Sequence, residues 1–101
     1  MPVLVELQWL GPEEGGRNTP PAGPQYTTVA KLEALADKWP SEAWSIVIEW
    51  HEPPGDDLRI EARMKFLVPD GPEHLLAPGS HFALYEGHRQ VAHGRVVKAI
   101  L

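Results

Sequence analysis

The sequence predicts an all-β protein of five or six mostly antiparallel strands with one short inserted helix. Several segments alternate apolar and polar residues, which is typical of strands that bury one face. The 101 residues include 11 prolines and 9 glycines, well above the average share of about 12% for these two residue types. This content favours many turns between short strands, and closing such a sheet into a barrel is one way to remove its unpaired edges.

The chain begins with a strand pattern that is followed by a long loop. Residues 2–10 alternate in polarity and end at a Gly-Pro pair, so a strand is expected there. Residues 11–25 are rich in glycine and proline, and a long structureless loop in a small domain is often functional. Residues 26–28 are expected to form a short extended piece. The apolar positions of the first strand are Val3, Val5, Leu7 and Trp9.

The segment from residue 28 to residue 39 has a different periodicity and predicts the inserted α-helix. Its apolar residues recur at helical spacing. The hydroxyl of Thr28 suits the N-cap, and Pro40 ends the helix. The apolar stripe consists of Val29, Leu32, Leu35, Ala36 and Trp39.

Further strands follow, separated by turns at residues 53–56, 69–72 and 86–88. The last strand is expected to bend near Gly94, because a glycine inside a strand often marks a bulge or a close backbone approach. The whole chain, 1–101, is expected to be one domain. The predicted strands cover residues 45–50, 58–68, 79–85 and 89–101, of which 58–68 has the clearest alternation.

Charge and composition exclude several classes of partner. The formal net charge is −5 and there is no cysteine. An acidic domain lacks the basic face of non-specific DNA binders, so no DNA partner is expected. Without cysteine, neither a disulfide nor a thiolate zinc site can form. There is no signal-peptide pattern and no apolar run near the roughly 20 residues that span a bilayer, so a cytoplasmic protein without a membrane partner is expected.

Three segments, taken in order, carry a resemblance. Residues 13–20 are Glu-Glu-Gly-Gly-Arg-Asn-Thr-Pro, with Pro-Gln-Tyr-Thr-Thr after a spacer. Residues 54–58 are Pro-Gly-Asp-Asp-Leu. Residues 82–98 run from Phe-Ala-Leu-Tyr through Glu-Gly-His-Arg-Gln-Val to Val-Val-Lys. They resemble the C-terminal β-barrel domain of translation elongation factor Tu, which carries Gly-Gly-Arg-His-Thr-Pro, Pro-Gly-Asp-Asn-Ile and Glu-Gly-Gly-Arg-Thr-Val. The resemblance covers nearly the whole chain apart from residues 29–50.

The resemblance implies a closed six-stranded antiparallel barrel that acts as a non-catalytic binding module. In the family this barrel packs on a GTPase domain and helps to hold aminoacyl-tRNA. The sequence has no Gly-x-x-x-x-Gly-Lys-Ser/Thr loop, so neither GTP nor another cofactor is expected. The chain departs from the family at His88, Gln90 and Ala92-His93, which add side chains to the surface that docks tRNA in the family.

Two segments that dock partners in the family form the expected partner-binding site. A protein partner is expected first, bound next to an exposed apolar patch near residues 28–39. The alternative is an RNA contact, linked to translation, through a basic strip. The expected site residues are Arg17, Asn18 and Thr19 in the long loop and Glu86, Gly87, His88 and Arg89 in the last hairpin. The strip would contain Arg59, Arg63, Lys65, Arg89, Arg95 and Lys98.

Arg17 has two interpretations. Its guanidinium binds a phosphate or carboxylate beside the amides of Gly15 and Gly16, or it pairs with Glu13 or Glu14 and holds the loop in place.

The four tryptophans also have two interpretations. Burial in the core and against the helix is favoured, with one indole partly exposed, and stacking on bases or anchoring a partner is the alternative. These tryptophans are Trp9, Trp39, Trp44 and Trp50.

A third hypothesis is a small metal-assisted enzyme. His81, His88 and His93 lie close in sequence with Glu86 among them, and imidazole and carboxylate groups bind divalent metals. The sequence contains no His-x-His or His-x₃-His pair among them. No metal ligand and no catalytic residue is therefore assigned.

Overall fold

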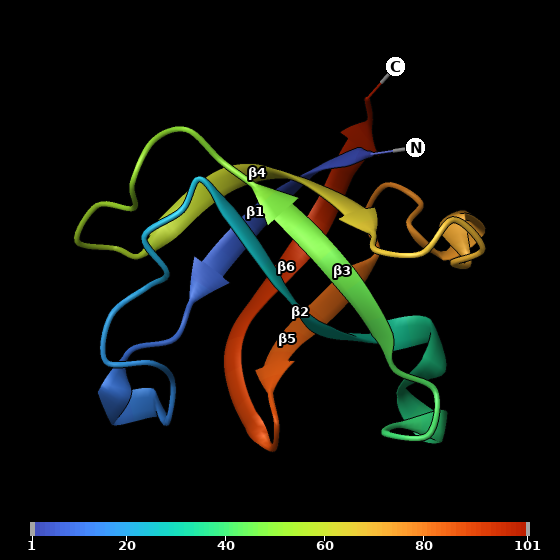
Figure 1. The fold of residues 1–101 in the computed structure, drawn as a ribbon, viewed down its shortest axis with the longest axis horizontal. Coiled ribbons are helices and arrows are strands. Elements are labelled where there is room, and N and C mark those ends of the chain that lie inside the picture. Colours follow the sequence, from blue (N-terminus) through green and yellow to red (C-terminus); the bar gives the residue numbers. More distant parts are fainter. Residues whose placement is uncertain (1, 101) are drawn as a thin grey trace.

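Six strands form one closed antiparallel barrel in the computed structural model, which describes residues 2–100 (Figure 1). The strands follow one another around the barrel in the order β1-β4-β3-β2-β5-β6, and β6 returns to pair with β1. The predicted all-β class and the closed six-stranded barrel are confirmed. The strands are β1 (Val3–Trp9), β2 (Gln25–Leu32), β3 (Trp44–Glu49), β4 (Arg59–Phe66), β5 (His81–Glu86) and β6 (Arg89–Ala99).

The interior of the barrel is filled by the alternating apolar residues that the sequence shows. In β4 every second side chain is buried over the whole strand, and β1 buries Val3, Val5, Leu7 and Trp9 in the same way. A closed barrel leaves no unpaired strand edge, so each strand needs only one apolar face. The largest fully buried side chains are Trp9, Leu7, Ile46, Ile48, Met64 and Leu84.

The prediction of an α-helix over residues 28–39 is wrong in extent and type. Residues 28–32 belong to β2, and only Glu33–Lys38 form a helix, η2, of the 3-10 type. Ala30 and Leu32 are buried and pair with Leu84 and Phe82 of β5. The barrel needs β2 to join β3 to β5, so strand pairing overrides the helical spacing of the apolar residues. Two further 3-10 turns are η1 (Pro12–Glu14) and η3 (Glu73–Leu75).

The last strand is irregular on both sides of Gly94 rather than at it. Pairing with β5 shifts by one residue between Leu84 and Tyr85, and pairing with β1 shifts between Leu4 and Val5. Gly94 itself marks a close approach, because a Cβ there would lie 2.6 Å from the carbonyl oxygen of Glu6 and 2.6 Å from the ring of Phe82. Only glycine lets the backbone of β6 come this close to β1.

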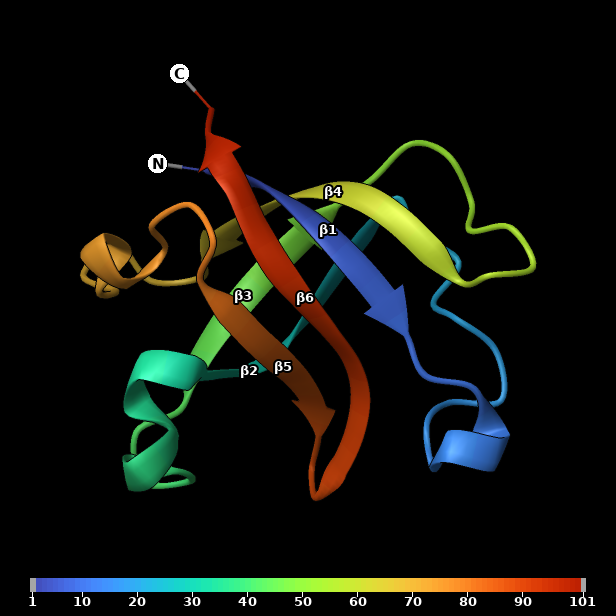
Figure 2. The same ribbon diagram turned by 180° about the vertical axis from the view of Figure 1, so that it is seen from behind.

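The connections place η2 beside the ends of β2 and β5, and both views of the ribbon agree on this (Figures 1 and 2). The loop that carries η1 lies at a different side of the β5–β6 turn in these views. Among residues 2–100 no helix is long and apolar enough to cross a membrane. In both views the β5–β6 turn lies between the η1 loop and η2.

Candidate functional site

An ion pair joins the long loop to the last hairpin. Nη1 of Arg17 lies 2.5 Å from Oε2 of Glu86, and Nε of Arg17 donates to the carbonyl oxygen of Thr19 at 3.0 Å. The hydroxyl of Tyr26, in β2, donates to the same oxygen of Glu86. The guanidinium carbon of Arg17 lies 5.9 Å from the centre of the Tyr26 ring. Two expected site residues, Arg17 and Glu86, are thus in direct contact, together with Tyr26.

The prediction that Arg17 pairs with a glutamate of its own loop is wrong. Arg17 pairs with neither Glu13 nor Glu14, and Oε1 of Glu14 instead accepts a hydrogen bond from the amide of Gly11 at 3.3 Å. The expected anion-binding amides are also engaged, because those of Gly15 and Gly16 donate to carbonyl oxygens of the same loop. The backbone of the loop is therefore hydrogen-bonded within the loop, and the guanidinium of Arg17 contacts the hairpin instead.

The contacts at this junction shift the pKa values of Tyr26 and Glu86. Burial, together with the hydrogen bond to Glu86, raises the pKa of Tyr26 to about 12. Burial acts to raise the pKa of Glu86, but the hydrogen bonds from Tyr26 and Arg17 and the nearby charge of Arg89 outweigh it and hold this pKa below its usual value. At neutral pH, Glu86 is therefore a carboxylate and Tyr26 a hydrogen-bond donor.

An open pocket of about 220 Å³ lies at this junction and is lined by Arg17, Asn18, Thr19, Glu86 and Arg89. These are five of the seven expected site residues. The remaining two, Gly87 and His88, line a neighbouring pocket of about 290 Å³. The β5–β6 turn thus separates a polar pocket from a second one, which also contains Val29, Trp39, Pro40, Ala43 and Tyr85.

The second pocket is aromatic. The rings of Trp39 and Tyr85 have their centres 4.7 Å apart, and both side chains are half-buried. Trp9 and Trp50 are buried in the core, whereas Trp44 is half-buried against Phe66. One indole was expected to be partly exposed, and in the structure two are, those of Trp39 and Trp44. The exposed apolar patch expected near residues 28–39 is not found there: among residues 2–100 the exposed large apolar side chains are Leu67 and Val68, and Trp39 is half-buried beside Tyr85.

Tyr26 is the participant that sequence reasoning missed. It lies in the Pro-Gln-Tyr segment that carries part of the resemblance, but no local pattern marks its hydroxyl as a donor to a hairpin 60 residues away. The signal was its position as a large polar aromatic residue at the start of a strand, since a buried tyrosine hydroxyl usually has a partner.

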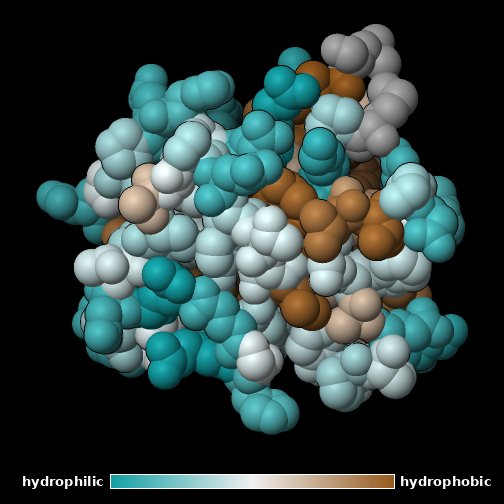
Figure 3. All heavy atoms as spheres, viewed as in Figure 1, coloured by the Kyte–Doolittle hydropathy of each residue, from teal (hydrophilic) through white to brown (hydrophobic). Residues whose placement is uncertain are grey.

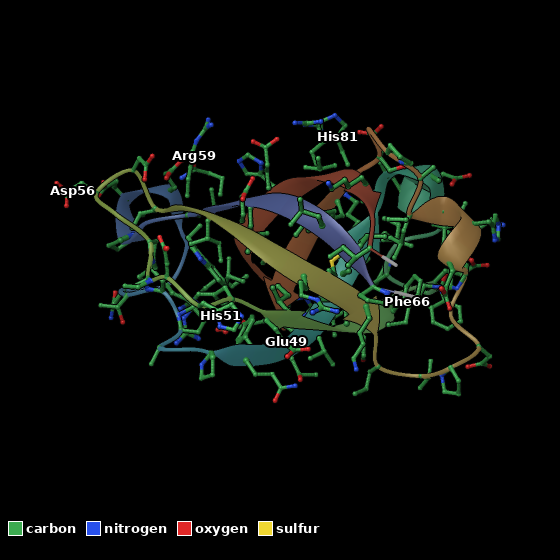
Figure 4. The ribbon with its side chains drawn as sticks, turned by 90° about the horizontal axis from the view of Figure 1, so that it is seen from above. Glu49, His51, Asp56, Arg59, Phe66 and His81 are labelled. Atoms are coloured by element: carbon green, nitrogen blue, oxygen red, sulfur yellow. The ribbon has the colours of Figure 1, made fainter. Side chains whose placement is uncertain are left out.

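The three histidines are not brought together. His81 and His93 both line a pocket of about 420 Å³ on the outer face of β1, β4, β5 and β6, whereas His88 lies in the β5–β6 turn. Figure 4 shows His81 on the same side of the barrel as Arg59, with Glu49 and His51 toward the opposite side. No group of three His, Asp or Glu side chains within residues 2–100 is placed to hold a metal ion.

The expected basic strip is assembled in part. Arg59, Arg63 and Lys65 project from the outer face of β4, and Arg95 and Lys98 project from β6, with β1 between these strands. Carboxylates interrupt it, because Arg95 bonds to Glu6, and Glu61 lies opposite Glu6 in the β1–β4 pair. Arg89 is not part of this face and lines the pocket beside Glu86.

The polar pocket is suited to binding a small anionic group. Within residues 2–100, the Arg89 side chain makes no hydrogen bond or ion pair, so its guanidinium is free for a bidentate contact with a carboxylate. Neither the known protein-family models nor the curated proteins contain a match to this chain. The inference of function therefore depends on the geometry of the two pockets.

Proposed function

We propose that this chain is a non-catalytic protein-interaction module whose barrel is of the type found at the C-terminus of elongation factor Tu. Its docking surface is the β5–β6 turn with the two pockets that flank it. The observation that carries the proposal is the convergence at one pocket of the loop residues 17–19 with Glu86 and Arg89. These are also the segments on which the resemblance depends.

The chemistry of the two pockets favours a partner with an acidic side chain next to an apolar one. The polar pocket holds two guanidinium groups, Arg17 and Arg89, against one carboxylate, Glu86. This leaves an excess of positive charge in a protein whose net charge is −5. An aromatic pocket beside a polar rim is the usual anatomy of a protein interface, in which Trp, Tyr and Arg contribute most of the binding energy.

Capture of partners from the native cell on immobilised protein tests the proposal. The double variant Arg17→Ala and Arg89→Ala should remain folded and lose most of the captured partner. The single variant Arg89→Ala should lose part of it with little change in stability, because this side chain makes no hydrogen bond or ion pair among residues 2–100 and acts on Glu86 only through its charge. Each captured partner is then purified and titrated directly against the same variants.

A matched control removes the same charge from another face. Lys65→Ala with Lys98→Ala also deletes two cations, but both lie on the outer face of β4 and β6. Protein partners that bind this control as tightly as the wild type, and the arginine variant weakly, support the proposal. Equal binding to both double variants overturns it.

RNA is the alternative outcome of the same experiment. Five of the nine cations lie on the outer face of β4 and β6, and a concentration of basic residues on one face is the electrostatic footprint of nucleic-acid binding. Loss of the captured material on RNase treatment, a steep decline of binding with salt and a larger defect in the lysine variant would favour RNA over the protein partner.

A further inference from the structure

Two pockets share Tyr85 of β5. One, of about 290 Å³, borders the segment after η2 and contains Trp39 and Pro40, and the other, of about 270 Å³, borders η2 and contains Lys31, Glu33, Ala36 and Gln90. Because Tyr85 lines both, we take the two pockets together as one groove with Tyr85 at its middle. Figures 1 and 2 show η2 beside β5.

The walls of the groove are aromatic and held on a rigid element. The ring of Tyr85 lies against that of Trp39, with an angle of 38° between the two planes. Tyr85 is inside β5, pairs with Val29 of β2, and its carbonyl oxygen accepts a hydrogen bond from the hydroxyl of Thr28. Side chains on paired strands keep their positions better than side chains on loops, so Tyr85 is preorganised.

The polar atoms of both rings are free to donate. In the part of the chain that the structure describes, neither the indole N–H of Trp39 nor the hydroxyl of Tyr85 has a hydrogen-bond partner. The free donors therefore stand beside aromatic faces along one groove. A ligand that fits needs exposed hydrogen-bond acceptors and apolar surfaces beside them.

From these observations we infer that the groove binds an extended, proline-rich peptide segment in the polyproline II conformation. This partner class rests on the proposed function as a protein-interaction module. Polyproline II has no internal hydrogen bonds, so its carbonyl oxygens are free to accept from Trp39 and Tyr85, and its proline rings pack on aromatic faces. The conformation is already formed in the free peptide, so binding orders little additional chain.

The charges around the groove favour a basic residue at one end of the peptide. The segment from Lys31 to Glu42 contains three carboxylates and two ammonium groups, and one of these, Lys38, pairs with Glu42 at 3.7 Å. Glu33 and Lys31 both line the groove, and neither Glu33 nor Asp37 has an ion pair among residues 2–100, so carboxylates outnumber ammonium groups along this segment by one. An arginine or lysine of the peptide therefore meets an unpaired carboxylate.

The apolar patch that contains Leu67 and Val68 is a less suitable site for such a peptide. Figure 3 shows apolar side chains gathered over β3 and the segment after β4, where Leu67 and Val68 are 54% and 40% exposed. These side chains are aliphatic and carry no donor, so they lack the selectivity for polyproline II. Leu67 is a useful control position for this reason.

The test is direct titration of the purified chain with two fluorescent peptides. One contains eight prolines with an arginine at one end, and the other replaces alternate prolines with alanine. We expect the first peptide to bind at least ten times more tightly, and the amide signals of β5 and η2 to shift in NMR spectra. Equal binding of both peptides, or shifts confined to other elements, would overturn the inference.

Variants identify the groove and guard against misfolding. Trp39→Ala should weaken binding at least tenfold, and Tyr85→Phe, which removes only the hydroxyl, severalfold. Trp39→Phe keeps an aromatic wall without the donor and should bind with intermediate affinity, so it replaces Trp39→Ala if that variant unfolds. Leu67→Ala, outside the groove, should bind like the wild type. Groove variants that bind as tightly as the wild type contradict the inference.

The experiments can overturn the groove inference and the proposed docking site independently of each other. If neither peptide binds but the arginine variant still loses its protein partner, the groove inference is wrong and the interaction module stands. If the proline peptide binds and the arginine variant captures its partner as well as the wild type does, the polar pocket is not the docking site.

Discussion

Tyr26, in β2, donates its hydroxyl hydrogen to Oε2 of Glu86, the last residue of β5. Arg17 of the long loop bonds to the same oxygen. One carboxylate oxygen therefore fixes a loop, a strand and a hairpin relative to one another. The strength of the contacts that Arg17 and Tyr26 make with this oxygen depends on its charge.

Glu86→Gln should lower the free energy of unfolding by about 1 kcal/mol at pH 7, the size of a charge-assisted hydrogen bond reduced by screening at a partly exposed site. The pKa of Glu86 is lower in the folded state than its ordinary value of 4.5. Its contribution is thus fully present above pH 4.5 and is lost as the pH falls through the folded pKa. Urea unfolding of both proteins from pH 7 to pH 3 should show the difference shrinking in that range. A difference independent of pH would contradict this role of the carboxylate.

Tyr26→Phe tests the same contact from the other side. We expect a loss of about 1 kcal/mol at neutral pH. The pKa of Tyr26 is raised to about 12, so the unfolded chain ionises near pH 10 while the folded chain keeps its proton. The tyrosine's contribution is therefore complete below pH 10 and declines as the pH rises toward 12. Denaturation at pH 8 and pH 10.5 measures it, and a stability difference that grows with pH would be the opposite of this prediction.

Gly94→Ala should destabilise the barrel by about 1–3 kcal/mol, the range for overpacking a close-packed site. The added methyl group meets the carbonyl oxygen of Glu6 and the ring of Phe82, each at 2.6 Å, so β6 must move away from β1. Gly55→Ala is the matched control, because its methyl group would find only one atom, at 3.7 Å. Thermal unfolding of the two variants should separate them, and equal melting temperatures would contradict the close approach at Gly94.

The strands were predictable where polarity alternates on a single face. Residues 58–68 and 2–10 carry this pattern, and β4 and β1 lie within these ranges. The pattern fails in β2, because apolar residues at positions 29, 30 and 32 fit both a strand and a helix. Which of the two forms is decided by β3 and β5, whose unpaired edges β2 covers, and no local pattern contains that information.

The structure brings five of the expected site residues to one pocket, but their contacts could not be predicted from the sequence. Arg17 and Glu86 were both expected to bind a partner, yet their bond to each other depends on how the barrel closes. Closure brings β2 next to β5 and so places Tyr26 and the η1 loop near the end of the hairpin. The charge of Arg17 favoured an ion pair, but sequence proximity pointed to Glu13 and Glu14, whose carboxylates lie on its own loop.

Ala30→Leu distinguishes the strand from the predicted helix. In the barrel Ala30 is fully buried and faces Leu84 of β5, so a larger side chain should cost about 1–3 kcal/mol through overpacking. In an α-helix over residues 28–39, position 30 lies off the apolar stripe and would tolerate leucine. Ala34→Leu, at an exposed position of η2, is the control and should change stability by less than about 0.5 kcal/mol. Urea unfolding of both variants measures the contrast, and a harmless leucine at position 30 would show that β2 does not pair as the structure has it.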